Sequence, residues 1–308
     1  MTPALLLSLL LAQNEPSPLE YSVSKVSGAS LALEDFEFTA FEKGQRLYLG
    51  VDEANLRASA APDGAVLQTL MLGTPVRVVA AGARAKVGEY VNTWYQVAVV
   101  DAKAPKGTAP VTGWVFGNTL TPFRVEADLD GDGELEVATL VMSNEFKARV
   151  RVLEPGVKPP RRVSSVDVPV ASTSYGMGQG GPATMTLVPA KKAGMALLVV
   201  DSRPERCGDL VTSYVSYAGA DGKKGVLGKA KLALELGGLM DPPSESTFEV
   251  SFQPASKRLQ VARTTVEDED AEGNPLKRAE RTLYQWQDGV FAEVGKPASS
   301  GAVSDVKP

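Results

Sequence analysis

The feature that most constrains the fold is a series of five short apolar runs between residues 46 and 122, separated by Gly, Pro and Asp residues. Each run has the length of one half-buried strand, and such a strand must bury one of its faces. Several short strands in succession can do this by curling into a small barrel. The sequence therefore predicts a small barrel over residues 41–122.

The order of motifs in this segment resembles that of a bacterial SH3-like (SH3b) domain. The motifs are Asn55-Leu56-Arg57, Gly73-Thr74 with Val76 and Val78, Trp94-Tyr95-Gln96-Val97, and Gly113-Trp114-Val115. The resemblance covers about residues 46–122. It implies a module that binds cell-wall peptides or envelope proteins and catalyses no reaction. It does not identify the ligand.

Aromatic residues of the predicted barrel are the candidates for a binding groove. They are Tyr90, Tyr95, Trp114 and Phe116. Aromatic side chains are enriched at recognition surfaces, although they fill cores more often. Alternation along a strand puts Trp94 and Tyr95 on opposite faces. We expect the connections at residues 80–92 and 101–112 to be loops at the barrel rim, where binding surfaces tend to be built.

A second motif follows the barrel, where carboxylates occupy positions 1, 3, 5 and 9 of a loop and glycine occupies position 6. Alternate acidic side chains on a tight turn converge on one point, and Gly133 permits the positive φ that this turn requires. Oxygen ligands of this kind favour Ca²⁺. The predicted ligands are the side chains of Asp128, Asp130, Asp132 and Glu136 and the backbone carbonyl of Glu134. The alternative is an acidic turn that binds no metal.

The acidic loop differs from an EF-hand, because Thr139 stands at its twelfth position and a strand pattern follows it. It resembles the D-x-D-x-D-G loops of FG-GAP or VCBS-type β-propeller repeats, with Glu136 where Asp is usual. The chain contains one such loop, so a full propeller of marked repeats is not indicated.

Residues 123–296 carry further short runs rich in Val, Thr and Tyr, which predict strands. Asp288-Gly289 between two of these runs predicts a tight hairpin turn. The predicted fold class is all-β. It consists of a small SH3-like barrel and a larger β-sandwich or degenerate propeller-like domain. The acidic loop lies at the start of the larger domain.

The N-terminus carries an apolar run, residues 4–12, that is too short to span a bilayer but suits a secretory signal. We expect a signal peptide at residues 1–13, a linker or extra strand at 14–40 and a disordered tail at 297–308. These features predict a periplasmic or secreted protein without a transmembrane anchor.

Composition excludes several function classes. The chain has no histidine, Cys207 is its only cysteine, and its net charge is −5. The usual Ser-His-Asp and Cys-His sites are therefore excluded, as is an intrachain disulfide. The acidic balance gives no electrostatic footprint for nucleic acid.

The function predicted from the sequence is that of a non-enzymatic envelope protein whose barrel binds peptidoglycan or a protein partner. One alternative is that the C-terminal β domain is the binding module and the barrel a spacer. Another is a cell-wall hydrolase that uses two carboxylates.

Overall fold

The computed structural model describes most of the chain between residues 19 and 295. The described ranges are 19–23, 38–88, 90–100, 105, 107–144, 147–158, 162–171, 179–203, 207–218, 224–242, 244–269 and 275–295. The signal peptide predicted at 1–13 and the tail predicted at 297–308 lie outside these ranges, as does most of the segment 14–40.

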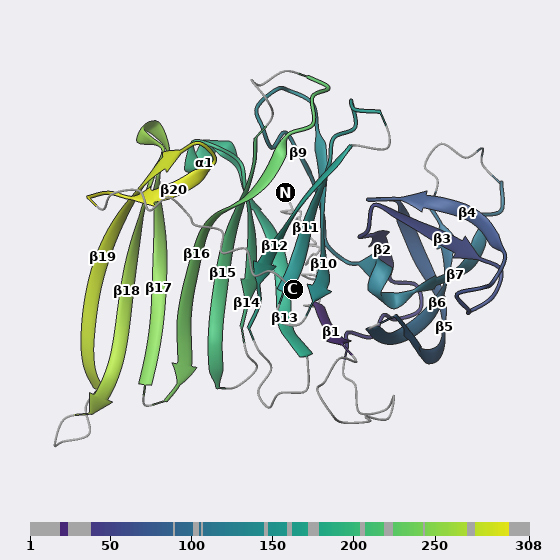
Figure 1. Ribbon diagram of the computed structural model, residues 1–308, viewed down its shortest axis with the longest axis horizontal. Coiled ribbons are helices and arrows are strands. Elements are labelled where there is room, and N and C mark those ends of the chain that lie inside the picture. The colour runs from purple at the N-terminus through teal and green to yellow at the C-terminus, as the bar shows by residue number, and fades with distance from the viewer. Residues whose placement is uncertain are drawn as a thin grey trace, which may run out of the picture.

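The prediction of an all-β protein is confirmed. The described residues form antiparallel strands with one short helix, α1 (Ala190–Ala193), and two 3-10 turns, η2 (Gly117–Thr119) and η3 (Pro254–Ser256). The strands make three units that follow one another along the molecule (Figure 1).

The first unit is a curled sheet of seven strands, which we call the half-barrel. In spatial order its strands are β4 (Val66–Met71), β3 (Glu53–Arg57), β7 (Thr112–Phe116), β6 (Tyr90–Val99), β5 (Pro75–Val87), β2 (Arg46–Leu49) and β8 (Leu120–Thr121). Its concave face buries Leu47, Leu56, Val76, Val97 and Val115.

The prediction of a loop at residues 80–92 is wrong, because most of this stretch belongs to the hairpin of β5 and β6. Its β5 part, Ala80-Ala81-Gly82-Ala83-Arg84-Ala85, consists mostly of small residues and is largely exposed. A half-buried strand is recognised in a sequence by the alternation of apolar and polar side chains. Alanine and glycine side chains are too small to show this alternation clearly. The second predicted loop covers residues 101–112. Its described residues 105 and 107–111 contain no strand.

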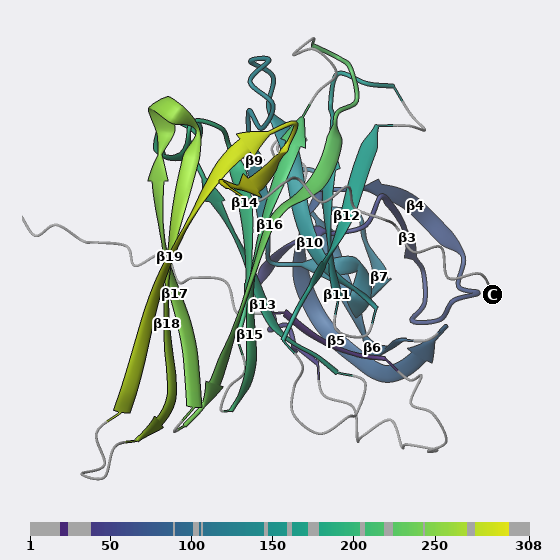
Figure 2. The same cartoon turned by 60° about the vertical axis from the view of Figure 1, so that its left-hand side comes forward.

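The other two units are a small sheet and a long sheet. The small sheet contains β9 (Arg124–Ala127), β10 (Glu136–Asn144), β11 (Lys147–Leu153) and β12 (Val163–Pro169). The long sheet contains β13 (Gln179–Val188), β14 (Leu197–Ser202), β15 (Gly208–Ala218), β16 (Lys229–Asp241), β17 (Ser244–Gln253), β18 (Arg258–Glu269), β19 (Pro275–Gln287) and β20 (Val290–Glu293). Strands β17–β19 extend well beyond the small sheet (Figures 1 and 2).

Strand β1 (Leu19–Val23) joins the half-barrel to the long sheet. It pairs with β6 on one side and with β13 on the other. Leu19 is fully buried and belongs to the main core. Because main-chain hydrogen bonds run through β1 to both neighbours, the two units form one continuous strand order.

Strand β10 of the small sheet is buried on both faces, because the small sheet lies between the other two units. On one face, Thr139 Oγ1 donates a hydrogen bond of 3.2 Å to the carbonyl of Gly50 in the half-barrel. On the same face, Arg151 Nε forms an ion pair of 2.9 Å with Asp52. The opposite face carries Ala138, Leu140, Val150 and Val152, all fully buried, in one core with residues of the long sheet.

The Asp288-Gly289 turn is confirmed. It connects β19 to β20, and both residues have positive φ, 50° and 90° respectively. Two successive residues with positive φ make the type I′ turn that matches the twist of a two-residue hairpin. The hairpin folds Phe291 onto a second apolar cluster with Trp286, with ring centroids 5.0 Å apart.

The contact between half-barrel and small sheet should be sensitive to Gly50→Ala. A methyl group there would overlap with Val141 Cγ1 and lie 3.0 Å from Thr121 Cγ2. Overpacking of this kind costs about 1–3 kcal/mol. Gly237→Ala is the matched control, since a Cβ at Gly237 meets nothing within 4 Å. Chemical unfolding should show a lower midpoint for the first variant alone; equal midpoints for both variants would contradict this account of the interface.

Candidate functional site

The acidic loop connects β9 to β10, and Glu136 pairs with Ala127 at its base. Gly131 and Gly133 both have positive φ, 86° and 85°, as the motif requires. The amides of these two glycines donate to the carboxylate of Asp128 at 2.7 and 3.1 Å. Leu129 is buried in the main core and holds the loop against the sheets. The loop thus folds as a tight turn around its own carboxylates.

Three carboxylates of this loop converge. Asp128, Asp130 and Glu136 each offer an oxygen, and these oxygens lie within 4.8 Å of one another. Bonds of 2.3–2.6 Å to a single Ca²⁺ would place ligand oxygens at such separations. Three of the five residues predicted as metal ligands are therefore brought together at the distances that one ion would require.

The remaining two predicted ligands lie beside this group. Asp132 Oδ1 accepts a hydrogen bond of 2.6 Å from the Glu134 amide. Glu134 turns its carboxylate over Gly156, where a Cβ would lie 2.6 Å from Glu134 Oε2. The space over Gly156 is therefore filled by the Glu134 carboxylate.

Glu154, which follows β11, is a buried carboxylate that the sequence did not bring to notice; it lies near Glu136, Asp130 and Asp132 but outside the group of three whose oxygens are within 4.8 Å of one another. Its side chain is fully buried and accepts a hydrogen bond of 3.3 Å from the Tyr217 hydroxyl. The signal was present in the sequence, because Glu154 continues the alternation of Ala148, Val150 and Val152, which form the buried face of β11.

Several carboxylate oxygens around the loop are buried and have no hydrogen-bond partner among the described residues. They are Asp130 Oδ2, Asp132 Oδ2, Glu134 Oε2, Glu136 Oε1 and Glu154 Oε1. Buried polar atoms nearly always have a partner, so five orphaned acceptors in one place require an explanation. A carboxylate accepts hydrogen bonds only, so this set fits a cation.

The pKa of Glu136 is raised to about 7. Burial of the side chain is the largest cause, and the neighbouring carboxylates of Glu154, Asp130 and Asp132 act in the same direction, whereas a hydrogen bond from the Leu129 amide acts against them. Burial is also the largest cause of the raised pKa of Asp130 and of Glu154. These shifts have one origin, which is negative charge placed in a poorly solvated space.

Two of the aromatic residues proposed for a groove lie in the core. Tyr95 is 1% exposed, and its hydroxyl accepts a hydrogen bond of 3.1 Å from the amide of Phe41. Phe116 is buried against Trp94, with ring centroids 5.5 Å apart.

The other two aromatic candidates make structural contacts. Tyr90 donates a hydrogen bond from its hydroxyl to the carbonyl of Ser143 in β10, which ties the half-barrel to the small sheet. Trp114 is half-buried and covers Gly82 of β5, where a Cβ would lie 2.7 Å from the indole ring. The structure therefore does not gather the four aromatic residues around a common groove.

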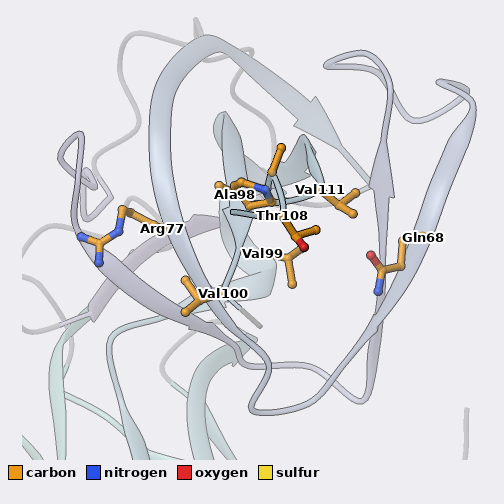
Figure 3. Close-up of a pocket in the computed structure, with 9 residues that line it drawn as sticks. Gln68, Arg77, Ala98, Val99, Val100, Thr108 and Val111 are labelled. Carbon is orange, nitrogen blue, oxygen red and sulfur yellow. The ribbon is translucent and has the colours of Figure 1, made fainter. Parts of the chain in front are cut away.

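The half-barrel does have a pocket, at a different position. Its volume is about 450 Å³, within the range of small-ligand sites. The lining residues are Gln68, Arg77, Ala98, Val99, Val100, Thr108, Ala109, Pro110 and Val111. Figure 3 shows Gln68 and Arg77 on opposite sides, with Val99 and Thr108 between them. The guanidinium of Arg77 donates to the carbonyl of Gly44. Apart from Arg77, Gln68 and Thr108, the lining residues have apolar side chains.

No protein-family model matches the chain, and neither the curated proteins nor the solved structures contain a match to it. Among the described residues, no helix is long and apolar enough to cross a membrane.

The raised pKa of Glu136 predicts how the stability of the protein changes with pH in the presence of a chelator. Between pH 4.5, the ordinary pKa, and about 7 the folded protein holds a proton that the unfolded protein releases. The contribution of Glu136 is thus most favourable at or below pH 4.5. It should be lost as the pH rises to 7, with a loss of the order of 3 kcal/mol.

Guanidinium unfolding at a series of pH values, on wild type and Glu136→Gln, isolates this contribution. The difference between the two proteins should change across this pH window. A constant difference would show that Glu136 titrates as an ordinary carboxyl group.

Proposed function

We propose that this protein is a non-enzymatic binding protein of the bacterial cell envelope, periplasmic or secreted, whose half-barrel binds a peptide. In this proposal the half-barrel is an SH3-like module, and the small and long sheets together form a β-sandwich. The partner is the peptide portion of peptidoglycan or an extended segment of an envelope protein.

The observation that carries this proposal is the pocket of the half-barrel. Val99, Val100 and Val111 offer apolar walls for a side chain. Gln68 and Thr108 offer amide and hydroxyl groups that can hydrogen-bond to peptide groups. A mostly apolar cavity with a few placed polar groups is the usual form of a specific binding site.

The surroundings of the pocket extend this surface. Val66 and Leu67 precede Gln68 on β4 and are 51% and 50% exposed, and Val111 is 48% exposed. Exposed apolar residues gathered near a pocket indicate a contact surface more than isolated ones do. A ligand longer than the pocket could therefore continue over β4.

Val111→Glu should abolish binding without unfolding the protein. The side chain is half exposed, so the fold tolerates a charge there, whereas a ligand in the pocket would bury that charge. The affinity should fall by more than about tenfold, which corresponds to about 1.4 kcal/mol. Co-sedimentation of the full chain with purified peptidoglycan is the measurement.

Val294→Glu is the matched control, because Val294 is also 48% exposed and does not line the pocket. Both variants should unfold at the same temperature as wild type, and only Val111→Glu should stay in the supernatant. Equal sedimentation of the two variants would contradict a role for the pocket. If the wild type does not sediment, peptidoglycan is not the ligand.

A further inference from the structure

Two buried glutamates face each other across β10 and β11. The register of these strands pairs Val137 with Leu153 and Ala138 with Val152. The next step outward along the same register brings Glu136 opposite Glu154. Both side chains are fully buried, and each continues the core-facing side of its strand. Like charges directly opposite each other destabilise a strand pair, so this pair needs a neutralising partner.

The described residues do not provide that partner. Glu136 Oε2 accepts from the Leu129 amide at 2.6 Å and Glu154 Oε2 from Tyr217, but Oε1 of each glutamate has no hydrogen bond within the described structure. Lys224 is exposed and lies near Gly133, and it forms no hydrogen bond with any of the orphaned oxygens.

A proton shared between the two glutamates would relieve only part of the repulsion. The orphaned oxygens of Asp130 and Asp132 lie in the same acidic group and would remain without a partner. One cation can be bound by several carboxylates at once. Ca²⁺ takes six to eight oxygen ligands and accepts irregular geometry, whereas Mg²⁺ requires a near-ideal octahedron and keeps several waters.

We propose that Glu154 completes a Ca²⁺ site with Asp128, Asp130 and Glu136, so that one ion bridges the acidic loop and the ends of β10 and β11. This goes beyond a loop that binds a metal through its own residues, because a buried ligand comes from a different strand. It is also independent of the proposed function of the half-barrel pocket.

The same ion would tie the small sheet to the long sheet. The Tyr217 hydroxyl of β15 donates to Glu154 and accepts a hydrogen bond of 2.7 Å from the Gly228 amide. Gly156 allows close approach there, since a Cβ at that position would lie 3.0 Å from Gly225 Cα. Three segments, the acidic loop, the end of β11 and the start of β16, therefore meet at the site.

Calorimetric titration of the chelator-treated full chain with CaCl₂ tests the proposal. Wild type should bind one Ca²⁺, and Glu154→Gln should bind it about 10- to 100-fold more weakly. Glu126→Gln is the control, because Glu126 is a half-exposed carboxylate of β9 that is paired with Arg124. The calcium affinity of this variant should equal that of wild type.

Melting curves separate a ligand from a merely structural residue. Without calcium, Glu154→Gln should melt at or above the wild-type temperature, because it removes one of the two opposed charges and keeps an acceptor for Tyr217. With calcium, wild type should gain more than the variant. If calcium neither binds to wild type nor raises its melting temperature, the two glutamates share a proton and the proposal is wrong.

Terbium luminescence gives a second readout that does not depend on a ligand variant. Tb³⁺ replaces Ca²⁺ at oxygen sites and emits when a nearby tyrosine absorbs light. The Tyr217 hydroxyl is hydrogen-bonded to Glu154, so Tyr217 should be the main residue that transfers energy to Tb³⁺. Tyr217→Phe should therefore remove most of the emission at saturating Tb³⁺. Undiminished emission from this variant, or unchanged calcium affinity in Glu154→Gln, would place the ion away from Glu154 and overturn the proposal.

Discussion

Burial of β10 on both of its faces is the constraint on which the rest of the structure depends. Alternate residues of β10 face the half-barrel or the long sheet, so neither side is solvated. Along most of β10 and β11 the core-facing side carries Ala, Leu, Val and Met. Glutamates occur only where this face reaches the acidic loop. A charge buried in a sheet of this kind is costly unless it is paired. The loop and the two glutamates must therefore be understood as one electrostatic unit.

The sequence shows parts of this unit but not the pairing between them. The loop geometry is local: alternate carboxylates and two glycines with positive φ determine it, and the expected turn is present. The all-β class and the Asp288-Gly289 turn are local in the same sense. Alternation in residues 148–154 places Glu154 on the buried face of its strand. What alternation cannot show is that this face lies opposite Glu136, because strand register is a property of two segments and not of one.

The aromatic candidates show a second limit of reasoning from one strand. Alternation puts Trp94 and Tyr95 on opposite faces, which predicts that one of them is exposed when a strand has a solvated side. Both are buried, at 4% and 1%, because β6 is covered on both faces. The pocket, in contrast, is lined mostly by small and β-branched residues at the end of β6 and in the segment before β7. Residues of these types occur throughout the chain, so no local pattern distinguishes them.

The half-barrel uses different residues to attach to the protein and to form its pocket. Gly50, Asp52 and Gly73 contact the small sheet, and Gly73 has a positive φ of 76° with Val137 packed against it. Strand β1 adds main-chain pairing along β6 near Tyr90 and Val91, far along that strand from Val99. None of these residues lines the pocket. Because the attachment and the pocket use different residues, a ligand bound in the pocket as proposed would leave the contact with the small sheet in place. A binding surface supported in this way needs little ordering when a ligand arrives, which lowers the entropic cost of binding.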